Sequence, residues 1–196
     1  MRVATRETKY GGLLTVLGLA TYFGWDMLKA PLEWATLVFA VLTAVYTAFL
    51  FAQAKGRDFW QSPALAVHML AHSFMAGAAA FSIIALFTPA ATDWLDYLKY
   101  ILITGIIINL LTVLVELTMT HPTKEAKIVV EMITKGRYRG AFWGGAIFFG
   151  NLVPLAILFI PGLATPVLAL AGLIVLIGIY LTEKIWVEAP QRVQLV

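Results

Sequence analysis

The chain has 196 residues, of which 61% are hydrophobic and 13% are charged. A water-soluble fold of this length could not hide so much apolar side chain, because small domains keep a large surface. The formal net charge of +3 is too small to indicate nucleic-acid binding, and the lack of cysteine excludes disulfides, thiolate zinc sites and cysteine-ligated iron–sulfur clusters within the chain. Composition therefore predicts an integral membrane protein.

Apolar runs long enough to cross a hydrocarbon core of about 30 Å predict about six transmembrane helices. In chain order the runs cover residues 11–27, 34–53, 63–87, 97–119, 141–160 and 164–187. The first run is the weakest, since it is short and contains Asp26, and Lys29-Ala30-Pro31 is expected to break the chain before the second run. We expect an all-α fold, a polytopic membrane helix bundle that forms one domain over residues 1–196.

The segment 121–138 between the fourth and fifth runs is polar and differs from the other connections. Residues 124–135 have helical spacing, and Ile128, Val129, Met132 and Ile133 fall on one side. This pattern predicts an amphipathic helix at the cytoplasmic surface, with a solvated loop as the alternative.

The basic residues predict the orientation. With six crossings, all but two of the 14 lysines and arginines fall on the face that carries both termini, whereas Lys29 and Lys99 fall on the other face. Because cytoplasmic loops are enriched in lysine and arginine, both termini should be cytoplasmic. Small residues four apart, as in Ser73/Gly77 and Gly140/Gly144, predict close helix contacts.

Ionisable and amide side chains at membrane depth are costly and often functional. Asp26 is expected near the outer end of the first helix, either as an interfacial carboxylate in water or as a proton acceptor beside an outer-leaflet site. Glu116 lies about one turn from the inner end of the fourth helix, where it either reaches the interface or belongs to an inner proton path. Asn109, two turns outward on a similar face, would extend that path.

His68 and His72 are four residues apart and share one face of the third helix. One helix cannot readily supply both axial ligands of a haem, and no third metal ligand is apparent nearby, so we predict neither a haem nor a metal site. The pair is either packed and hydrogen-bonded or part of a proton relay, with His72 as the candidate for proton movement, because histidine titrates near neutral pH. Tyr46 on the second helix either packs or hydrogen-bonds a quinone carbonyl.

Several motifs, taken in order, resemble the NrfD/PsrC family, the membrane subunits of polysulfide-reductase-type complexes. The core of the resemblance is Tyr46-Thr47-Ala48-Phe49-Leu50 followed by Ala54-Lys55-Gly56-Arg57-Asp58-Phe59-Trp60 and Ser62-Pro63. Glu116 matches a late-helix glutamate of the family, and 135–138, 142–144 and 153–154 resemble its penultimate segment. Ala48 and Asp58 replace the usual glycine and proline, and two helices precede Tyr46 where the family has four, so the chain looks like a member without the first two helices.

The resemblance implies a subunit of a prokaryotic inner-membrane respiratory complex, which exchanges electrons between the quinone pool and a ferredoxin-like iron–sulfur partner. It also implies a molybdopterin-type or other redox subunit, and another membrane chain can supply the missing helices. The cofactor would be menaquinone or ubiquinone, bound at or near this chain, with Tyr46 and Asp26 as candidates for the quinone region. A non-catalytic membrane anchor is the alternative; a small proton channel or transporter is less favoured, since no inverted repeat is visible.

Overall fold

The computed structural model describes residues 4–54, 57–88, 90–119 and 123–193, and the side chains from residue 11 onward within those ranges. The elements in chain order are α1 (Ala4–Tyr22), α2 (Asp26–Ala52), the 3₁₀ helix η1 (Asp58–Gln61), α3 (Ala64–Ile84), α4 (Thr92–Thr118), α5 (Lys124–Thr134), the π-helix η2 (Ala141–Leu152), α6 (Val153–Leu158) and α7 (Thr165–Gln191). The described part of the chain contains no strand, which confirms the all-α prediction.

Among the described residues, five helical segments are long and apolar enough to cross a membrane: α2, α3, α4, the continuous η2–α6 segment Ala141–Leu158, and α7. A helix of 27 residues, such as α2, is about 40 Å long, which exceeds the hydrocarbon core. The sixth predicted crossing corresponds to a shorter apolar stretch, Gly11–Tyr22 of α1. The chain is therefore a multi-pass membrane protein, and its orientation stays a prediction.

The boundary between the first two helices differs from the prediction. Gly24 has a φ of +71°, a conformation that favours glycine, and reverses the chain there. Asp26 consequently begins α2 rather than ending the first helix. The predicted break at Lys29-Ala30-Pro31 is also wrong, because Pro31 lies inside α2. Pro31 is past the first turn of α2, and the backbone hydrogen bond that it removes is tolerated because neighbouring groups and local adjustments in a membrane helix satisfy the freed carbonyl.

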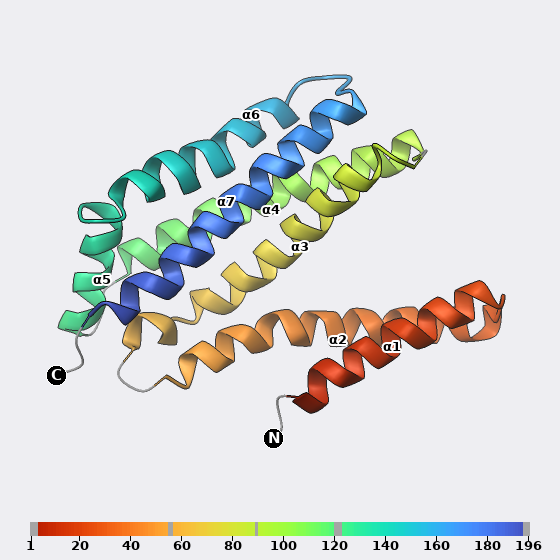
Figure 1. The fold of residues 1–196 in the computed structure, drawn as a ribbon, viewed down its shortest axis with the longest axis horizontal. Helices are drawn as coiled ribbons and strands as arrows, with labels where there is room; N and C mark the ends of the chain where they lie inside the picture. The colour runs from red at the N-terminus through yellow and green to blue at the C-terminus, as the bar shows by residue number, and fades with distance from the viewer. Residues whose placement is uncertain (1–3, 55–56, 89, 120–122, 194–196) are drawn as a thin grey trace.

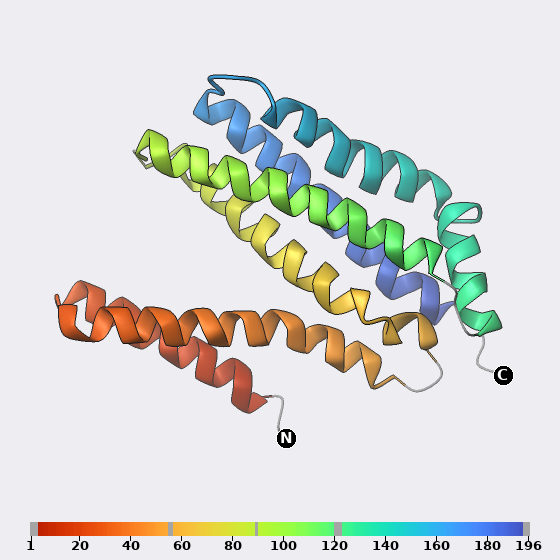
Figure 2. The ribbon, with the colours of Figure 1, turned by 180° about the vertical axis from the view of Figure 1, so that it is seen from behind.

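Figures 1 and 2 show α3, α4, α7 and the η2–α6 segment side by side in a bundle, with the α1–α2 hairpin set apart from it. The hairpin meets the bundle through α2 and α3. Of the apolar 18-residue window of α2, 11% is buried within the chain, compared with 44% for α3 and α7. Most of the surface of α2 is thus left for lipid or for another membrane chain.

Close helix contacts in the bundle occur at glycines other than the predicted ones. Gly150 of η2 and Gly178 of α7 face each other so closely that a Cβ on either would overlap the backbone of the other. A Cβ on Gly77, Gly140 or Gly144 would meet nothing within 4 Å. The predicted small-residue pairs therefore do not mark tight contacts within this chain, because helix rotation decides which small residues face a neighbour.

The predicted amphipathic segment forms α5. Its N-cap is Thr123, whose hydroxyl accepts a hydrogen bond from the Ala126 amide. The buried face is Ala126, Val129 and Ile133, which packs on the end of the bundle, whereas Ile128 is exposed. Residues 120–122 of the predicted segment lie outside the described residues. The apolar face thus covers protein rather than lipid.

The 3₁₀ helix η1 and the C-terminal end of α7 lie at the end of the bundle that α5 covers. The indole of Trp60 in η1 donates to the Trp186 carbonyl of α7 over 2.8 Å. The Arg57 guanidinium donates to the carbonyls of Pro190 and Val193, the latter at 2.7 Å. These bonds hold the α2–α3 connection against the C-terminal segment.

Candidate functional site

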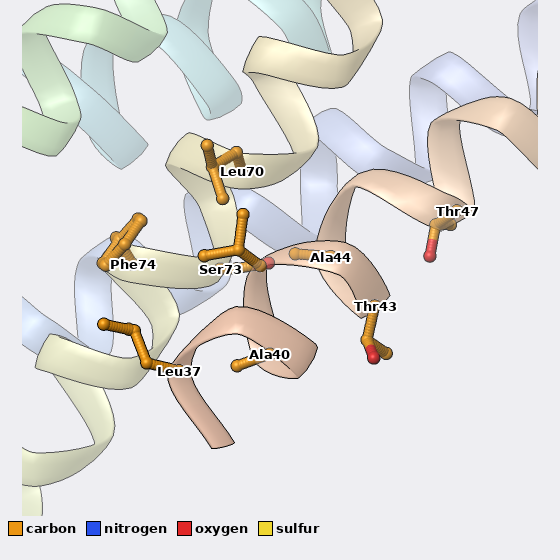
Figure 3. A pocket seen from close by; sticks show the side chains of 9 residues that line it. Leu37, Ala40, Thr43, Ala44, Thr47, Leu70, Ser73 and Phe74 are labelled. Carbon is orange, nitrogen blue, oxygen red and sulfur yellow. The ribbon is translucent and has the colours of Figure 1, made fainter. Parts of the chain in front are cut away.

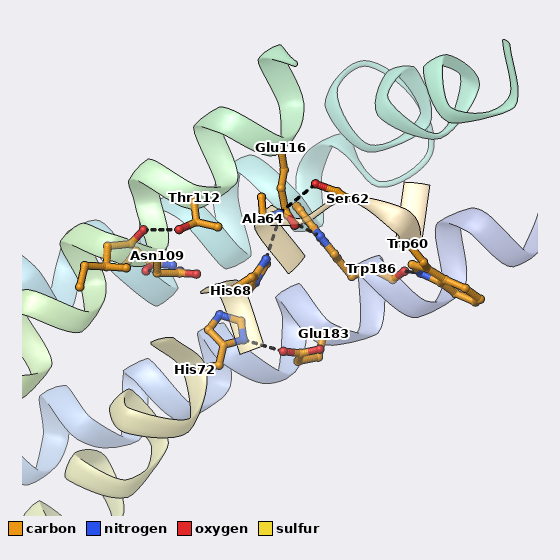
Figure 4. Close-up of polar contacts among 12 residues, drawn as sticks. Trp60, Ser62, Ala64, His68, His72, Asn109, Thr112, Glu116, Glu183 and Trp186 are labelled. Atoms are coloured by element: carbon orange, nitrogen blue, oxygen red, sulfur yellow. Dashed lines mark hydrogen bonds and ion pairs between the residues drawn. The ribbon is translucent and has the colours of Figure 1, made fainter. Parts of the chain in front are cut away.

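A buried polar network lies inside the bundle, near the end covered by α5 (Figure 4). Nδ1 of His68 on α3 lies 2.8 Å from Oε2 of Glu116 on α4. The Trp186 indole of α7 donates to the same oxygen over 3.1 Å. All three residues are at most 2% exposed. One carboxylate therefore joins three helices in the interior, where a hydrogen bond or ion pair is electrostatically stronger than in water.

The second histidine has a carboxylate partner of its own. Nδ1 of His72 lies 2.6 Å from Oε1 of Glu183 on α7. His72 is buried, while the Glu183 side chain is 30% exposed. The two imidazole rings meet edge to face, with centroids 4.3 Å apart. The predicted shared face is confirmed, and each ring faces a different carboxylate because α4 and α7 flank α3.

Two asparagines extend the polar interior away from the histidines. Asn109 of α4 donates to Oδ1 of Asn151 over 2.9 Å, and Asn151 donates to the Ala146 carbonyl of the π-helix over 2.8 Å. Asn109 also adjoins His72. Within the described residues, Oδ1 of Asn109 and Nε2 of both histidines are buried without a hydrogen-bond partner. Because Asn109 and the His72 imidazole adjoin each other, Nε2 of His68 is the atom that most clearly indicates a place for a further group, since buried polar atoms normally have partners.

The three residues predicted for proton movement, Glu116, His72 and Asn109, lie in this one network. Glu116 is 2% exposed, so the alternative in which it reaches the interface is wrong. Glu116 and Asn109 were expected on a similar face of one helix, two turns apart, and both side chains are buried on α4. Proton movement through these residues stays a prediction.

The two residues predicted for the quinone region are not brought together. Asp26 is the first residue of α2 and Tyr46 lies 20 positions further along the same helix, which separates them by about 30 Å. The Asp26 side chain is 83% exposed and pairs with Lys29 at 2.6 Å. Tyr46 is half-buried. One quinone ring cannot contact both side chains within this chain.

Glu183 and Trp186 are the site residues that sequence reasoning missed. The predicted last helix ends at residue 187, and with that boundary Glu183 was interpreted as a charge near the helix end. In the structure α7 continues to Gln191, so Glu183 lies two turns before the end and opposite His72. The spacing of three between Glu183 and Trp186 places them on one face of a helix, and this was the signal that the sequence offered.

A groove of about 390 Å³ separates α2 from α3 (Figure 3). Its walls are mainly apolar, and its three hydroxyl groups are those of Thr43, Thr47 and Ser73. Thr43 and Ser73 donate to backbone carbonyls of their own helices. Tyr46 is on α2 but does not line this groove. The groove thus suits an apolar ring or chain better than a strongly polar ligand.

The fold and the network define the class: a polytopic α-helical membrane protein with ionisable, hydrogen-bonded side chains in its interior. The profile of the polysulphide reductase NrfD family matches residues 6–191, so the chain belongs to that family. Members of the family are membrane subunits of quinone-linked oxidoreductase complexes that contain iron–sulfur and molybdoenzyme subunits. No curated protein shows a significant sequence match to the chain.

Proposed function

We propose that this chain links the quinone pool to an iron–sulfur subunit by taking part in quinone binding on its α2–α3 side. Family membership carries the proposal. Because the chain has no cysteine, a partner has to hold any cysteine-ligated cluster that receives or supplies the electrons. A bound quinone would supply two-electron, two-proton chemistry.

The groove between α2 and α3 fits the apolar part of a quinone. Its volume of about 390 Å³ is in the range of small-molecule sites, and Leu37, Leu70 and Phe74 give it an apolar wall. Alanines at 40 and 44 leave the space open on the α2 side (Figure 3). In this proposal the groove binds and orients the ligand, and it excludes water from it.

The groove offers few donors for the two carbonyls of a quinone, and Thr47 carries the hydroxyl that remains as a candidate. Two of the three groove hydroxyls already donate to their own helices, and Tyr46 lies outside the lining. The exposed surface of α2 would let another membrane chain complete the site. The alternative function, a membrane anchor with no quinone of its own, is favoured by the large separation of Asp26 and Tyr46.

The decisive experiment uses the complex purified from membranes in mild detergent, with its subunits identified and its quinone content measured. Ala44→Phe fills the groove, and Leu42→Phe adds the same ring on an exposed position of α2 outside the lining. We expect Ala44→Phe to lower quinone retention and quinol-dependent reduction of the cluster at least tenfold. Leu42→Phe should retain quinone and reduce the cluster nearly as well as the parent protein.

A second pair of variants tests Tyr46. Tyr46→Phe removes one hydroxyl, and Tyr97→Phe removes one from an exposed tyrosine on α4. Loss of quinone in Tyr46→Phe alone would assign that hydroxyl to the site. Cluster-bearing partners with quinone unchanged in Ala44→Phe and Tyr46→Phe would support the anchor function instead, and a chain that purifies without partners would contradict both.

A further inference from the structure

The two carboxylate–histidine pairs place an unusual amount of charge in the interior of the bundle. Glu116 is buried, and Glu183 is largely so, with a side chain 30% exposed. Among the described residues, the polar contacts of the two carboxylates are with imidazole and indole groups, and none is with a lysine or arginine. A buried carboxylate is costly unless its charge is balanced. Two protons on the imidazoles would balance the charge, and so would one divalent cation.

The hydrogen bonds determine which ring nitrogens remain free. In a neutral imidazole one nitrogen donates and the other accepts. A carboxylate accepts, so Nδ1–H of His68 donates to Glu116, and its Nε2 carries a lone pair. Nε2 of His68 is buried and has no partner in the described part of the chain. His72 uses its other nitrogen: Nε2 is buried and its imidazole adjoins Asn109, whereas Nδ1 faces Glu183 at 2.6 Å, where a cation would replace the shared proton. Histidines that bind metals commonly donate their other N–H to a carboxylate in this way.

Three ligand atoms are already close together. His68, His72 and Glu183 each offer one atom that is within 4.8 Å of the other two, and the three residues come from two adjacent helices. Trp186 and His68 hold Glu116 in place from opposite helices (Figure 4). The third ligand, which the histidine pair lacks on its own helix, is thus supplied by α7.

We propose that His68, His72 and Glu183 bind one divalent transition-metal cation of the zinc or cobalt class, with Glu116 orienting His68. Imidazole nitrogen combined with carboxylate oxygen suits these ions better than magnesium or calcium. Three protein ligands leave a coordination position open. The proposal does not depend on quinone binding.

The test uses the full chain purified in mild detergent, stripped with a chelator and titrated with Co²⁺, whose visible absorption reports its ligand geometry. Bound metal is counted by elemental analysis after desalting. We expect about one Co²⁺ per chain, and at least a tenfold loss of affinity in His72→Gln and in Glu183→Gln. Glu116→Gln should weaken binding by about 10- to 100-fold, the usual effect of losing an outer partner of a metal-binding histidine.

Glu131→Gln, on the exposed side of α5, is the matched control and should bind like the parent. X-ray absorption at the cobalt edge of the parent protein gives a readout that needs no variant, and two imidazole ligands are expected. Absence of stoichiometric metal, unchanged affinity in both His72→Gln and Glu183→Gln, or a spectrum without imidazole would each overturn the proposal.

Discussion

His68 and Glu116 are 48 positions apart in the chain, and Nδ1 of His68 lies 2.8 Å from Oε2 of Glu116. The contact joins α3 to α4 in a part of the bundle where both side chains are almost fully buried. Because Trp186 of α7 donates to the same oxygen, the three helices cannot shift independently without leaving a buried polar group unpaired.

Removal of Glu116 alone should destabilise the bundle strongly. Glu116→Leu leaves the His68 imidazole and the Trp186 indole without their acceptor, and breaking a buried pair costs about 3–5 kcal/mol. The double variant His68→Leu/Glu116→Leu should recover part of that loss, because fewer polar groups are then left unpaired. The free energy of unfolding of the single and double variants is measured by SDS titration in mixed micelles, with chelator present. Additive effects of the two single changes would contradict a coupled pair.

A methyl group at the contact between η2 and α7 should force the helices apart. Gly150→Ala or Gly178→Ala places a Cβ against the backbone of the facing glycine, and overpacking of this kind costs about 1–3 kcal/mol. Gly144→Ala, in the same π-helix, is the matched control because its Cβ would meet nothing within 4 Å. Thermal unfolding in detergent compares the three variants, and equal effects of Gly150→Ala and Gly144→Ala would contradict the contact.

Loss of Arg57 should loosen the C-terminal end of α7. The guanidinium donates to the carbonyls of Pro190 and Val193, and hydrogen bonds from a charged group are worth about 1.5–3 kcal/mol. Arg57→Ala should therefore speed hydrogen exchange over residues 187–193, whereas Arg139→Ala, at an exposed position, should not. Unchanged exchange in Arg57→Ala would show that the contact does not hold this segment.

The orientation can be tested cleanly because the chain has no cysteine of its own. We expect Lys29→Cys to react with a membrane-impermeant thiol reagent added outside intact cells, and Arg139→Cys to react only after the membrane is opened. The reason is the excess of lysine and arginine on the face that carries Arg139. The opposite pattern of labelling would place the termini outside.

The long apolar segments of the fold were predictable because crossing a bilayer imposes a local length and hydropathy requirement on each helix. The runs 63–87 and 97–119 correspond to α3 and α4 with shifts of a few residues. The first connection was not predictable by the same rules, because proline is a turn signal in the sequence, whereas the membrane helix α2 accommodates Pro31 in its interior.

The candidate site was predictable only in part. Polarity at membrane depth identified Glu116, His72 and Asn109, and all three lie in the buried network. It also identified Asp26, which is an exposed helix-start carboxylate paired with Lys29. Polarity by itself does not report whether a residue faces the bundle, the lipid or the interface, since that depends on the rotation of its helix.

The sequence by itself determined that this protein lies in a membrane, that its elements are helices, and that it belongs with the NrfD family, because composition, run length and ordered motifs are properties of the chain alone. Only the tertiary structure decided that Glu116 meets His68, that Glu183 meets His72, and that Gly150 meets Gly178. These partners are far apart in the chain, and contacts of that kind follow from how whole helices pack and rotate against each other, which no local pattern records.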